Sequence, residues 1–445
     1  RFDGTFRHGF YGPNYDRLRG TYAAETIGYL QNPDAEEFDV TTMGIYGEAG
    51  ADLLDLIRFE AGYFWPWEVT SGGSWQPSDE DELNLTATIR EGLLPLGISA
   101  SFGYRRTFFV PTLLGEGEFS DATLFDLASL TKLFTTSALL ALATQHTLDL
   151  HTPLVDIIPE FGAISPRSID GGQDPHSKAY LPTPAHLQNA TVNPADVTLW
   201  HLLTHTSGLP PWRDVYTAGN WAVALKRSVA YPFVDHPGAG VRYSDIGFML
   251  LGEVVARKNG TPLDTAIHQH VLAPLNLTEA ITFNPTQPKE HIAPTELDLT
   301  WRKERVWGVV HDENACGVGG VAGHAGLFGT LDGVATFGRA WLNRSGLAIR
   351  DDLWHAATRE QVRTGDQRRG LGWMLRAPQN ASAGDLMSTH AYGHTGFTGT
   401  ALWIDPQHAV VSVILTNAVY YGREYLGRLH PFRRQINDEI MRAIL

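Results

Sequence analysis

A serine and a lysine three residues apart open a long apolar stretch of this chain. The motif is Ser129-Leu130-Thr131-Lys132, and the run Leu130–Leu142 is nearly all apolar. Such a run predicts a buried helix, and residues three apart on a helix share one face. A serine hydroxyl is a poor nucleophile until a neighbouring base takes its proton. The Lys132 amine could be that base, or it could hold a second base in its anionic form.

A tyrosine stands just before a second apolar helix. Tyr243-Ser244-Asp245 precedes Ile246–Lys258, a helical pattern that closes at Asn259-Gly260. A nearby cation favours the phenolate form of a tyrosine, so Tyr243 beside Lys132 could act as general base toward Ser129. Taken alone the motif has a simpler explanation, in which Asp245 caps the helix and Tyr243 is a half-buried aromatic residue.

A glycine-rich segment leads into an apolar strand near the end of the chain. It reads Gly393-His394-Thr395-Gly396-Phe397-Thr398-Gly399, and the strand is Ala401–Ile404. Small residues let the backbone approach a substrate closely, and a backbone N–H on such an edge can help to stabilise an oxyanion. The alternative is an ordinary turn that happens to contain one histidine.

The three motifs, in this order, resemble those of one enzyme family. It is the penicillin-recognising serine hydrolases, in the branch that contains class C β-lactamases, D-Ala-D-Ala carboxypeptidases and β-lactamase-like esterases. The resemblance covers about residues 83–445 and does not cover residues 1–80. Three further stretches resemble the same branch: His201–Leu209, Gly319–Phe328 and Leu402–Pro406.

The resemblance implies a role for each motif. Ser129 would form an acyl-enzyme, while Lys132 and Tyr243 would activate it and move protons. The backbone N–H groups of Ser129 and Phe397 would form the oxyanion hole, and His394 would face Tyr243 across the site. No metal or organic cofactor is implied. The residues expected to hold the oxyanion and the substrate are Phe397, Asp245, His394, Thr395 and Gly396.

Two positions depart from the family pattern. Asp245 stands where the family usually has Asn, and His394 stands where many β-lactamases have Lys. If Asp245 faces Lys132, its charge keeps that lysine protonated and favours Tyr243 as the base. A histidine is mostly neutral at pH 7, which weakens recognition of a substrate carboxylate. We therefore expect ester or D-amino-acid peptide or amide hydrolysis. The alternatives are a β-lactamase and a catalytically weak penicillin-binding or sensor module.

The composition excludes several other classes of protein. The net charge is -15 with no basic run, so nucleic acid is not an expected partner. The sequence contains no stretch of about 20 apolar residues, so we expect no transmembrane helix. Cys316 is the only cysteine, and alone it cannot build a cysteine-rich zinc site. A metal site at His311-Asp312-Glu313 and His324 is not expected either, because adjacent residues rarely converge on one ion. The expected partner is a small-molecule or peptide substrate.

The chain reads as two parts. Residues 1–80 are rich in Gly and aromatic residues, with alternating stretches such as Phe59–Tyr63, and predict a β-rich extension. Residues 83–445 would form the hydrolase domain. Its front would be a helix through Leu85, Ile89 and Leu93, then two strands, Ile98–Phe102 and Arg106–Val110, joined by a turn at Gly103.

The end of the chain predicts the rest of the domain. Strands Ala401–Ile404 and Val410–Leu415 precede a helix at Phe432–Leu445. Together with the front strands they suggest an α/β fold of the α+β type, like that of β-lactamases and transpeptidases. An antiparallel sheet would be flanked by the terminal helices and joined to a mainly helical lobe. Since the chain begins at Arg1, we expect a fragment or a processed form, from which a signal peptide could have been removed. The expected location is extracytoplasmic, in the periplasm, the cell envelope or secreted.

Overall fold

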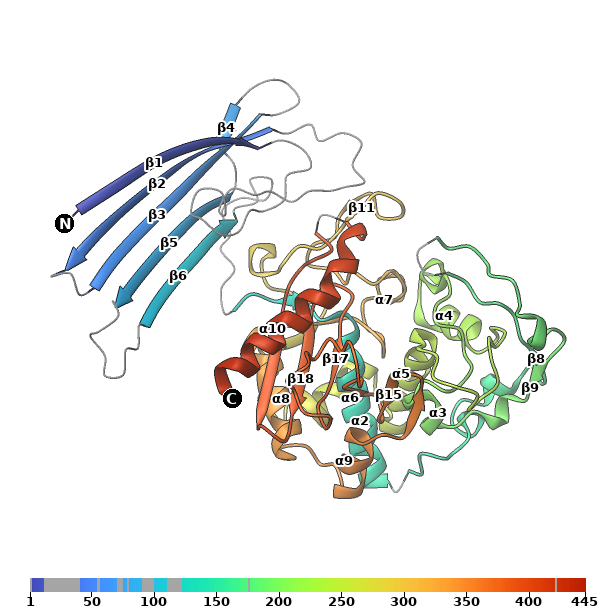
Figure 1. Ribbon diagram of the computed structural model, residues 1–445. Helices are drawn as coiled ribbons and strands as arrows, with labels where there is room; N and C mark the ends of the chain where they lie inside the picture. Colours follow the sequence, from blue (N-terminus) through green and yellow to red (C-terminus); the bar gives the residue numbers. More distant parts are fainter. Residues whose placement is uncertain are drawn as a thin grey trace. The chain divides into compact units, whose positions relative to one another are not determined.

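The computed structural model divides the chain into two compact units, Arg1–Glu118 and Phe119–Leu445 (Figure 1). In the first unit it describes the backbone of strands lying between residues 2 and 109. In the second it describes residues 122–445, apart from residues 147, 175, 176 and 421. Within these residues no helix is both long enough and apolar enough to cross a membrane.

The first unit contains one antiparallel sheet of six strands. Its order is β1-β2-β3-β5-β6, and β4 pairs with β3. The segment Phe59–Tyr63 lies inside β3, as its alternation predicts. The strands are β1 (Phe2–Tyr11), β2 (Thr41–Leu53), β3 (Ile57–Val69), β4 (Trp75–Pro77), β5 (Glu80–Ile89) and β6 (Ala100–Phe109).

The structure differs from the prediction at residues 85–110, where we expected the hydrolase domain to begin. Leu85 and Ile89 lie in β5 rather than in a helix, while Leu93 lies outside the described residues. A spacing of four residues fits period two as well as period 3.6, and here the alternation of Leu83, Leu85 and Ile89 decides for a strand. The predicted turn at Gly103 is also wrong, because Gly103 lies within β6 and pairs with Thr86.

The sheet of the second unit is built from the last part of the chain alone. It has six antiparallel strands in chain order, so the front strands do not join it, contrary to our prediction. The fold class itself is confirmed, with helices and antiparallel sheets mixed in one unit. The strands are β14 (Val362–Thr364), β15 (Gln367–Arg369), β16 (Met374–Leu375), β17 (Tyr392–Thr395), β18 (Ala401–Asp405) and β19 (Val410–Ile414).

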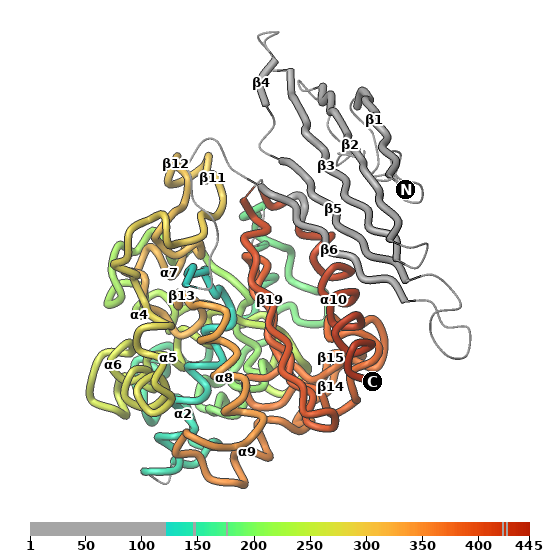
Figure 2. Tube along the Cα trace, turned by 90° about the vertical axis from the view of Figure 1, so that its left-hand side faces the viewer, coloured from blue at the N-terminus to red at the C-terminus, as the bar shows by residue number. Residues whose placement is uncertain are grey.

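Helices cover both faces of this sheet. On one face α10 (Leu429–Ile444) packs Ile436, Ile440 and Met441 against Trp403 and its neighbours. On the other face α8 (Leu331–Asn343) approaches β18 and β19 so closely that a Cβ on Gly338 would lie 2.6 Å from Val411. Figure 2 shows α10 and α8 on either side of β19. Strand β18 is therefore buried on both faces.

The helical part is organised around two buried helices. These are α2 (Thr131–His146) and α5 (Asp245–Asn259), which pack against each other and confirm the two predicted apolar helices. Gly260 ends α5 in a left-handed conformation, as expected. The other helices are α3 (Leu199–Leu203), α4 (Trp221–Ser228), α6 (Leu263–Ile267), α7 (Glu313–Gly317) and α9 (Asp351–Thr358).

Short strands fix the segment in front of α2. Strand β7 (Phe125–Asp126) pairs with β13 (Leu327–Gly329), which pairs in turn with β10 (Ile281–Phe283). The chain then turns through one 3₁₀ helix, Ala128–Leu130, and enters α2. The remaining short strands are β8 (Arg167–Ser168), β9 (Thr191–Val192), β11 (Leu297–Asp298) and β12 (Glu304–Arg305).

Candidate active site

Ser129 lies in the 3₁₀ turn that leads into α2. The residue before it, Ala128, has φ +46°, an uncommon conformation for a residue other than glycine. Asp126 holds this turn, because its Oδ1 accepts the Ala128 N–H at 2.8 Å and its Oδ2 accepts the His311 N–H at 2.6 Å. The nucleophile candidate thus sits on backbone that is fixed by a buried carboxylate.

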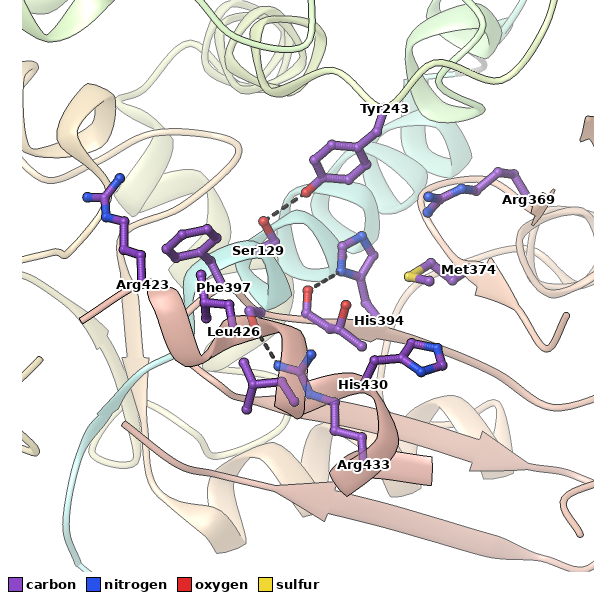
Figure 3. Close-up of a pocket in the computed structure, with 13 residues that line it drawn as sticks. Ser129, Tyr243, Arg369, Met374, His394, Phe397, Arg423, Leu426, His430 and Arg433 are labelled. Carbon is purple, nitrogen blue, oxygen red and sulfur yellow. Dashed lines mark hydrogen bonds between the residues drawn. The ribbon is translucent and has the colours of Figure 1, made fainter. Parts of the chain in front are cut away.

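The hydroxyl of Ser129 meets the two predicted partners. Lys132 Nζ donates a hydrogen bond to Ser129 Oγ at 2.9 Å. The Tyr243 hydroxyl donates one to the same oxygen at 2.8 Å (Figure 3). Tyr243 immediately precedes the Ser244 N-cap of α5, and Lys132 lies in the first turn of α2, so the packing of these helices joins the two motifs.

Lys132 is fully buried and has three oxygen neighbours. Besides Ser129 Oγ, its Nζ donates to the His324 carbonyl at 2.9 Å and lies 2.8 Å from Asp245 Oδ1. Burial acts to lower the pKa of Lys132, but the interactions with Asp245 and Tyr243 outweigh it and raise the pKa. The lysine is therefore an ammonium ion, and Asp245 does face it.

Tyr243 is in its phenol form. Burial raises the pKa of Tyr243, and Asp245 raises it further, while Lys132 pulls it down by less. The sequence correctly indicates the direction of the effect of Lys132, but it does not reveal that burial is the larger one. In the resting site, then, both Lys132 and Tyr243 are protonated donors to Ser129.

Two neutral histidines flank Tyr243. His394 on β17 lies opposite, with ring centroids 6.1 Å apart, and burial lowers its pKa well below the usual value, helped by Arg369. Its Nδ1 lies 2.9 Å from the Thr395 carbonyl, which assigns the proton to Nδ1. His205 stacks 4.6 Å from Tyr243 and accepts the Ser244 N–H at 3.1 Å. Burial lowers the pKa of His205 well below its usual value, so this ring is neutral, and its Nδ1 holds the backbone in front of α5.

The glycine-rich segment is tied to the backbone next to Ser129. Thr398 Oγ1 donates to the Asp126 carbonyl at 2.7 Å, and Thr400 Oγ1 donates to the Leu127 carbonyl at 3.2 Å. Gly396 is required here, because a Cβ on it would lie 2.1 Å from Thr400 Oγ1. The residue after it, Phe397, borders the cavity beside Ser129.

Ser129 lies between two cavities. The larger, of about 670 Å³, extends over β17 toward α10, and the smaller, of about 240 Å³, contains Trp212, Asp312 and Glu313. Ser129, Tyr243, Phe397 and Arg423 line both. The larger cavity is also lined by Arg369, Met374, His394, Thr395, Gly396, Leu426, Leu429, His430 and Arg433.

Arg369 on β15 is a site residue that the sequence analysis missed. It is only 7% exposed, and Figure 3 shows its guanidinium beside Tyr243 and His394. Burial lowers the pKa of Arg369 to about 10, and no carboxylate pairs with it among the described residues. The sequence does not reveal this role, because the charged run of Asp366, Arg368 and Arg369 is typical of a solvent-exposed turn.

The residues weighed as metal ligands are engaged elsewhere. His311 Nε2 lies 2.8 Å from Glu296, and His324 Nε2 lies 2.8 Å from Asp312. His324 lowers the pKa of Asp312, although burial acts to raise it. In the part of the chain that the structure describes, no three His, Cys, Asp or Glu side chains come together in a way that could hold a metal ion.

Comparison with known proteins identifies the family of this chain. A family model described as β-lactamase matches residues 110–430. A putative D-alanyl-D-alanine carboxypeptidase of Escherichia coli K12 is 33% identical over 327 residues, which are 66% of this chain and 69% of that protein. An N-acetylmuramyl-L-alanine amidase of Bacillus subtilis is 31% identical over 351 residues, 72% and 73% of the two chains.

Solved structures show the same fold at lower identity. EstCE1, a hydrolase with promiscuous acyltransferase activity, superposes with a TM-score of 0.57 at 18% identity, covering 82% of this chain and 94% of that one. A penicillin-binding protein of Bacillus halodurans gives a TM-score of 0.50 at 21% identity, covering 75% and 90%. The chain thus belongs to the β-lactamase family and is a serine hydrolase.

Proposed function

We propose that Ser129 is the nucleophile and that the substrate is an ester, or a D-amino-acid peptide or amide with a carboxylate on its leaving group. The observation that carries the proposal is the position of Ser129 Oγ, 2.9 Å from Lys132 Nζ and 2.8 Å from the Tyr243 oxygen, at the junction of two cavities. The reaction belongs to the unit Phe119–Leu445. An extracytoplasmic location goes with the proposal, supported by the family resemblance, and fractionation of the host cell would test it.

The acylation step needs the Lys132–Tyr243 pair to have lost one proton. Ser129 Oγ then attacks the substrate carbonyl, and its proton passes to the Tyr243 oxygen, 2.8 Å away. The backbone N–H groups of Ser129 and Phe397 hold the oxyanion. Tyr243 next protonates the leaving group, which departs and leaves the acyl-enzyme. In the second half, water attacks the acyl carbon and gives a proton to Tyr243. Tyr243 then returns that proton to Ser129 Oγ as the bond between Oγ and the acyl carbon breaks and the acid departs.

Lys132 stays an ammonium ion through these steps. Asp245 at 2.8 Å and the His324 carbonyl at 2.9 Å hold it in place, and its charge stabilises the Tyr243 phenolate whenever that forms. This division of roles makes Tyr243 the base and Lys132 its electrostatic support. It also explains a charge in a fully buried position, which would otherwise be costly.

The larger cavity fits a leaving group that carries a carboxylate. Arg369 is a buried cation with no carboxylate partner among the described residues, and a bound carboxylate would supply one. Arg369 therefore provides the cation that neutral His394 does not. Discrimination against β-lactams then rests on Asp245 alone, because an ionised carboxylate that pairs with Lys132 cannot donate a hydrogen bond to an acyl-chain amide.

A substrate panel tests the proposed function. We expect kcat/KM for p-nitrophenyl butyrate and for a D-Ala-D-Ala peptide to exceed that for a chromogenic cephalosporin. Ser129→Ala should lose at least about 10³-fold on each substrate, since a serine nucleophile has no substitute. Activity that survives Ser129→Ala would refute the site. A cephalosporin preferred by the unmodified protein would refute the substrate class and leave the nucleophile in place. A penicillin adduct that forms and never turns over would favour the sensor alternative.

Arg369→Gln tests the carboxylate-binding residue. Loss of one charge-assisted contact costs about 1.5–3 kcal/mol, so kcat/KM for the D-Ala-D-Ala peptide should fall roughly ten- to a hundredfold. Hydrolysis of the uncharged p-nitrophenyl butyrate should stay within about threefold. The control is Arg363→Gln, an exposed arginine on the neighbouring strand β14, which should change neither rate. An equal loss on both substrates would refute carboxylate binding by Arg369.

Asp245→Asn tests the proton balance of the site. Because Asp245 raises the pKa of Lys132 and also that of Tyr243, removing its charge lowers both. Acylation needs the deprotonated pair, so kcat/KM for p-nitrophenyl butyrate should rise with pH, and the midpoint of that rise should move to lower pH in Asp245→Asn.

The matched control for the pH profile is Asp312→Asn. Asp312 borders the smaller cavity too, but its carboxylate pairs with His324. The Asp312→Asn variant should still cap the N-terminus of α7, and it should shift the midpoint of the pH profile less than Asp245→Asn does. A midpoint that stays in place or moves to higher pH in Asp245→Asn would contradict the assigned roles. Background hydrolysis is taken from Ser129→Ala at each pH.

A further inference from the structure

The C-terminal helix contributes a buried arginine to the wall of the larger cavity. Arg433 on α10 is 7% exposed, and its Nη2 donates to the Gly396 carbonyl at 2.6 Å (Figure 3). The same Nη2 donates to the Thr400 carbonyl at 2.9 Å. Burial lowers the pKa of Arg433 to about 10. Among the residues that the structure describes, no carboxylate pairs with it. Its charge is therefore directed at two backbone carbonyls.

These two carbonyls belong to the turn that carries Phe397. The Gly396 N–H donates to the Thr400 carbonyl at 2.7 Å, and the Gly399 N–H donates to the Gly396 carbonyl at 3.2 Å. From the other side, Thr398 and Thr400 bind the carbonyls of Asp126 and Leu127, just before Ser129. The turn is thus held between the nucleophile segment and Arg433.

The Gly396 carbonyl and the Phe397 N–H are two ends of one peptide group. The group is planar and trans, so its C=O and N–H point in opposite directions, and resonance couples them. A cation that hydrogen-bonds to the carbonyl oxygen draws electron density from the nitrogen and makes the N–H a stronger donor. It also fixes the plane of the peptide, and hence the direction of the N–H.

We propose that Arg433 is a positioning residue of the oxyanion hole, which acts through the Gly396–Phe397 peptide group to orient and polarise the Phe397 N–H. The inference rests on the proposed function, in which that N–H stabilises the oxyanion. Arg433 contacts the peptide from the side opposite to its N–H, so it assists any acyl substrate, charged or uncharged. In this it differs from Arg369, which serves only substrates with a carboxylate.

The competing role for Arg433 is direct binding of a substrate anion, since it lines the cavity. The two roles separate on a neutral substrate. An oxyanion forms only in the transition state, so a weaker oxyanion hole lowers kcat and leaves KM nearly unchanged. An anion-binding arginine instead raises KM for the D-Ala-D-Ala peptide and leaves p-nitrophenyl butyrate unaffected.

The experiment measures kcat and KM for p-nitrophenyl butyrate and for the D-Ala-D-Ala peptide in Arg433→Gln, Arg433→Lys and Arg434→Gln. We expect Arg433→Gln to lower kcat for both substrates by about tenfold, less than the roughly 10²–10³ that follows loss of a donor itself. Arg433→Lys keeps a charged donor and should recover most of the rate. Arg434, the next residue, pairs with Asp385 at the surface, and its variant is the control that should match the unmodified protein.

The infrared carbonyl stretch of the acyl-enzyme gives a second readout that a loss of stability alone would not move. It should shift to higher frequency in Arg433→Gln, and by less in Arg433→Lys, as the hydrogen bonds to the acyl oxygen weaken. If Arg433→Gln fails to fold, the carbonyl frequency of Arg433→Lys decides, because the inference requires a shift there even though most of the rate is recovered. Unchanged kcat and an unchanged carbonyl frequency in the folded variant, or a loss confined to KM of the peptide, would overturn the inference. Absence of Ser129-dependent hydrolysis in the unmodified protein would instead overturn the proposed function.

Discussion

The buried ion pair between Lys132 and Asp245 is the interaction on which the rest of the site depends. An ammonium ion with no exposed surface is stable only when oxygen atoms surround it, and here they come from three separate parts of the chain. The turn before α2 supplies Ser129 Oγ, helix α5 supplies the Asp245 carboxylate, and the segment before β13 supplies the His324 carbonyl. The same packing brings Tyr243 to Ser129. Gly323 permits it, because a Cβ there would lie 2.2 Å from the Phe248 carbonyl of α5.

The charged groups around Ser129 differ between the two cavities. On the side of the smaller cavity stand carboxylates, with Asp245 and Asp312 near Ser129. On the side of the larger cavity stand two buried guanidinium groups, Arg369 and Arg433, that no carboxylate neutralises among the described residues. In the proposed reaction, such an arrangement would orient a substrate with its acyl portion toward the acids and an anionic leaving group toward the arginines. The β-lactamase fold is shared with hydrolases of several substrate classes, so the proposed substrate class rests on these charges rather than on the fold.

How much of this could be predicted from the sequence depended on whether the signal was local. The apolar runs of α2 and α5 and the motifs at Ser129 and Tyr243 were readable, because each lies within a few residues. The segment through Leu85 was misassigned, since its four-residue spacing fits a strand and a helix equally well. Arg369 and Arg433 were missed for a different reason: an arginine in a charged segment looks solvated, and only tertiary packing reveals that it is buried. The opposing pull of burial and Lys132 on the pKa of Tyr243 is likewise invisible without distances.

The central claim is that one serine, Ser129, carries the acyl group. The most direct measurement is mass spectrometry of the intact protein after reaction with a fluorophosphonate probe, followed by peptide mapping. The account predicts a single adduct, located on the peptide that contains Ser129, and no adduct on Ser129→Ala. It further predicts much slower labelling of Tyr243→Phe, because the proton of the serine would lose its acceptor. An adduct on a different residue, formed equally well by Ser129→Ala, would contradict the account.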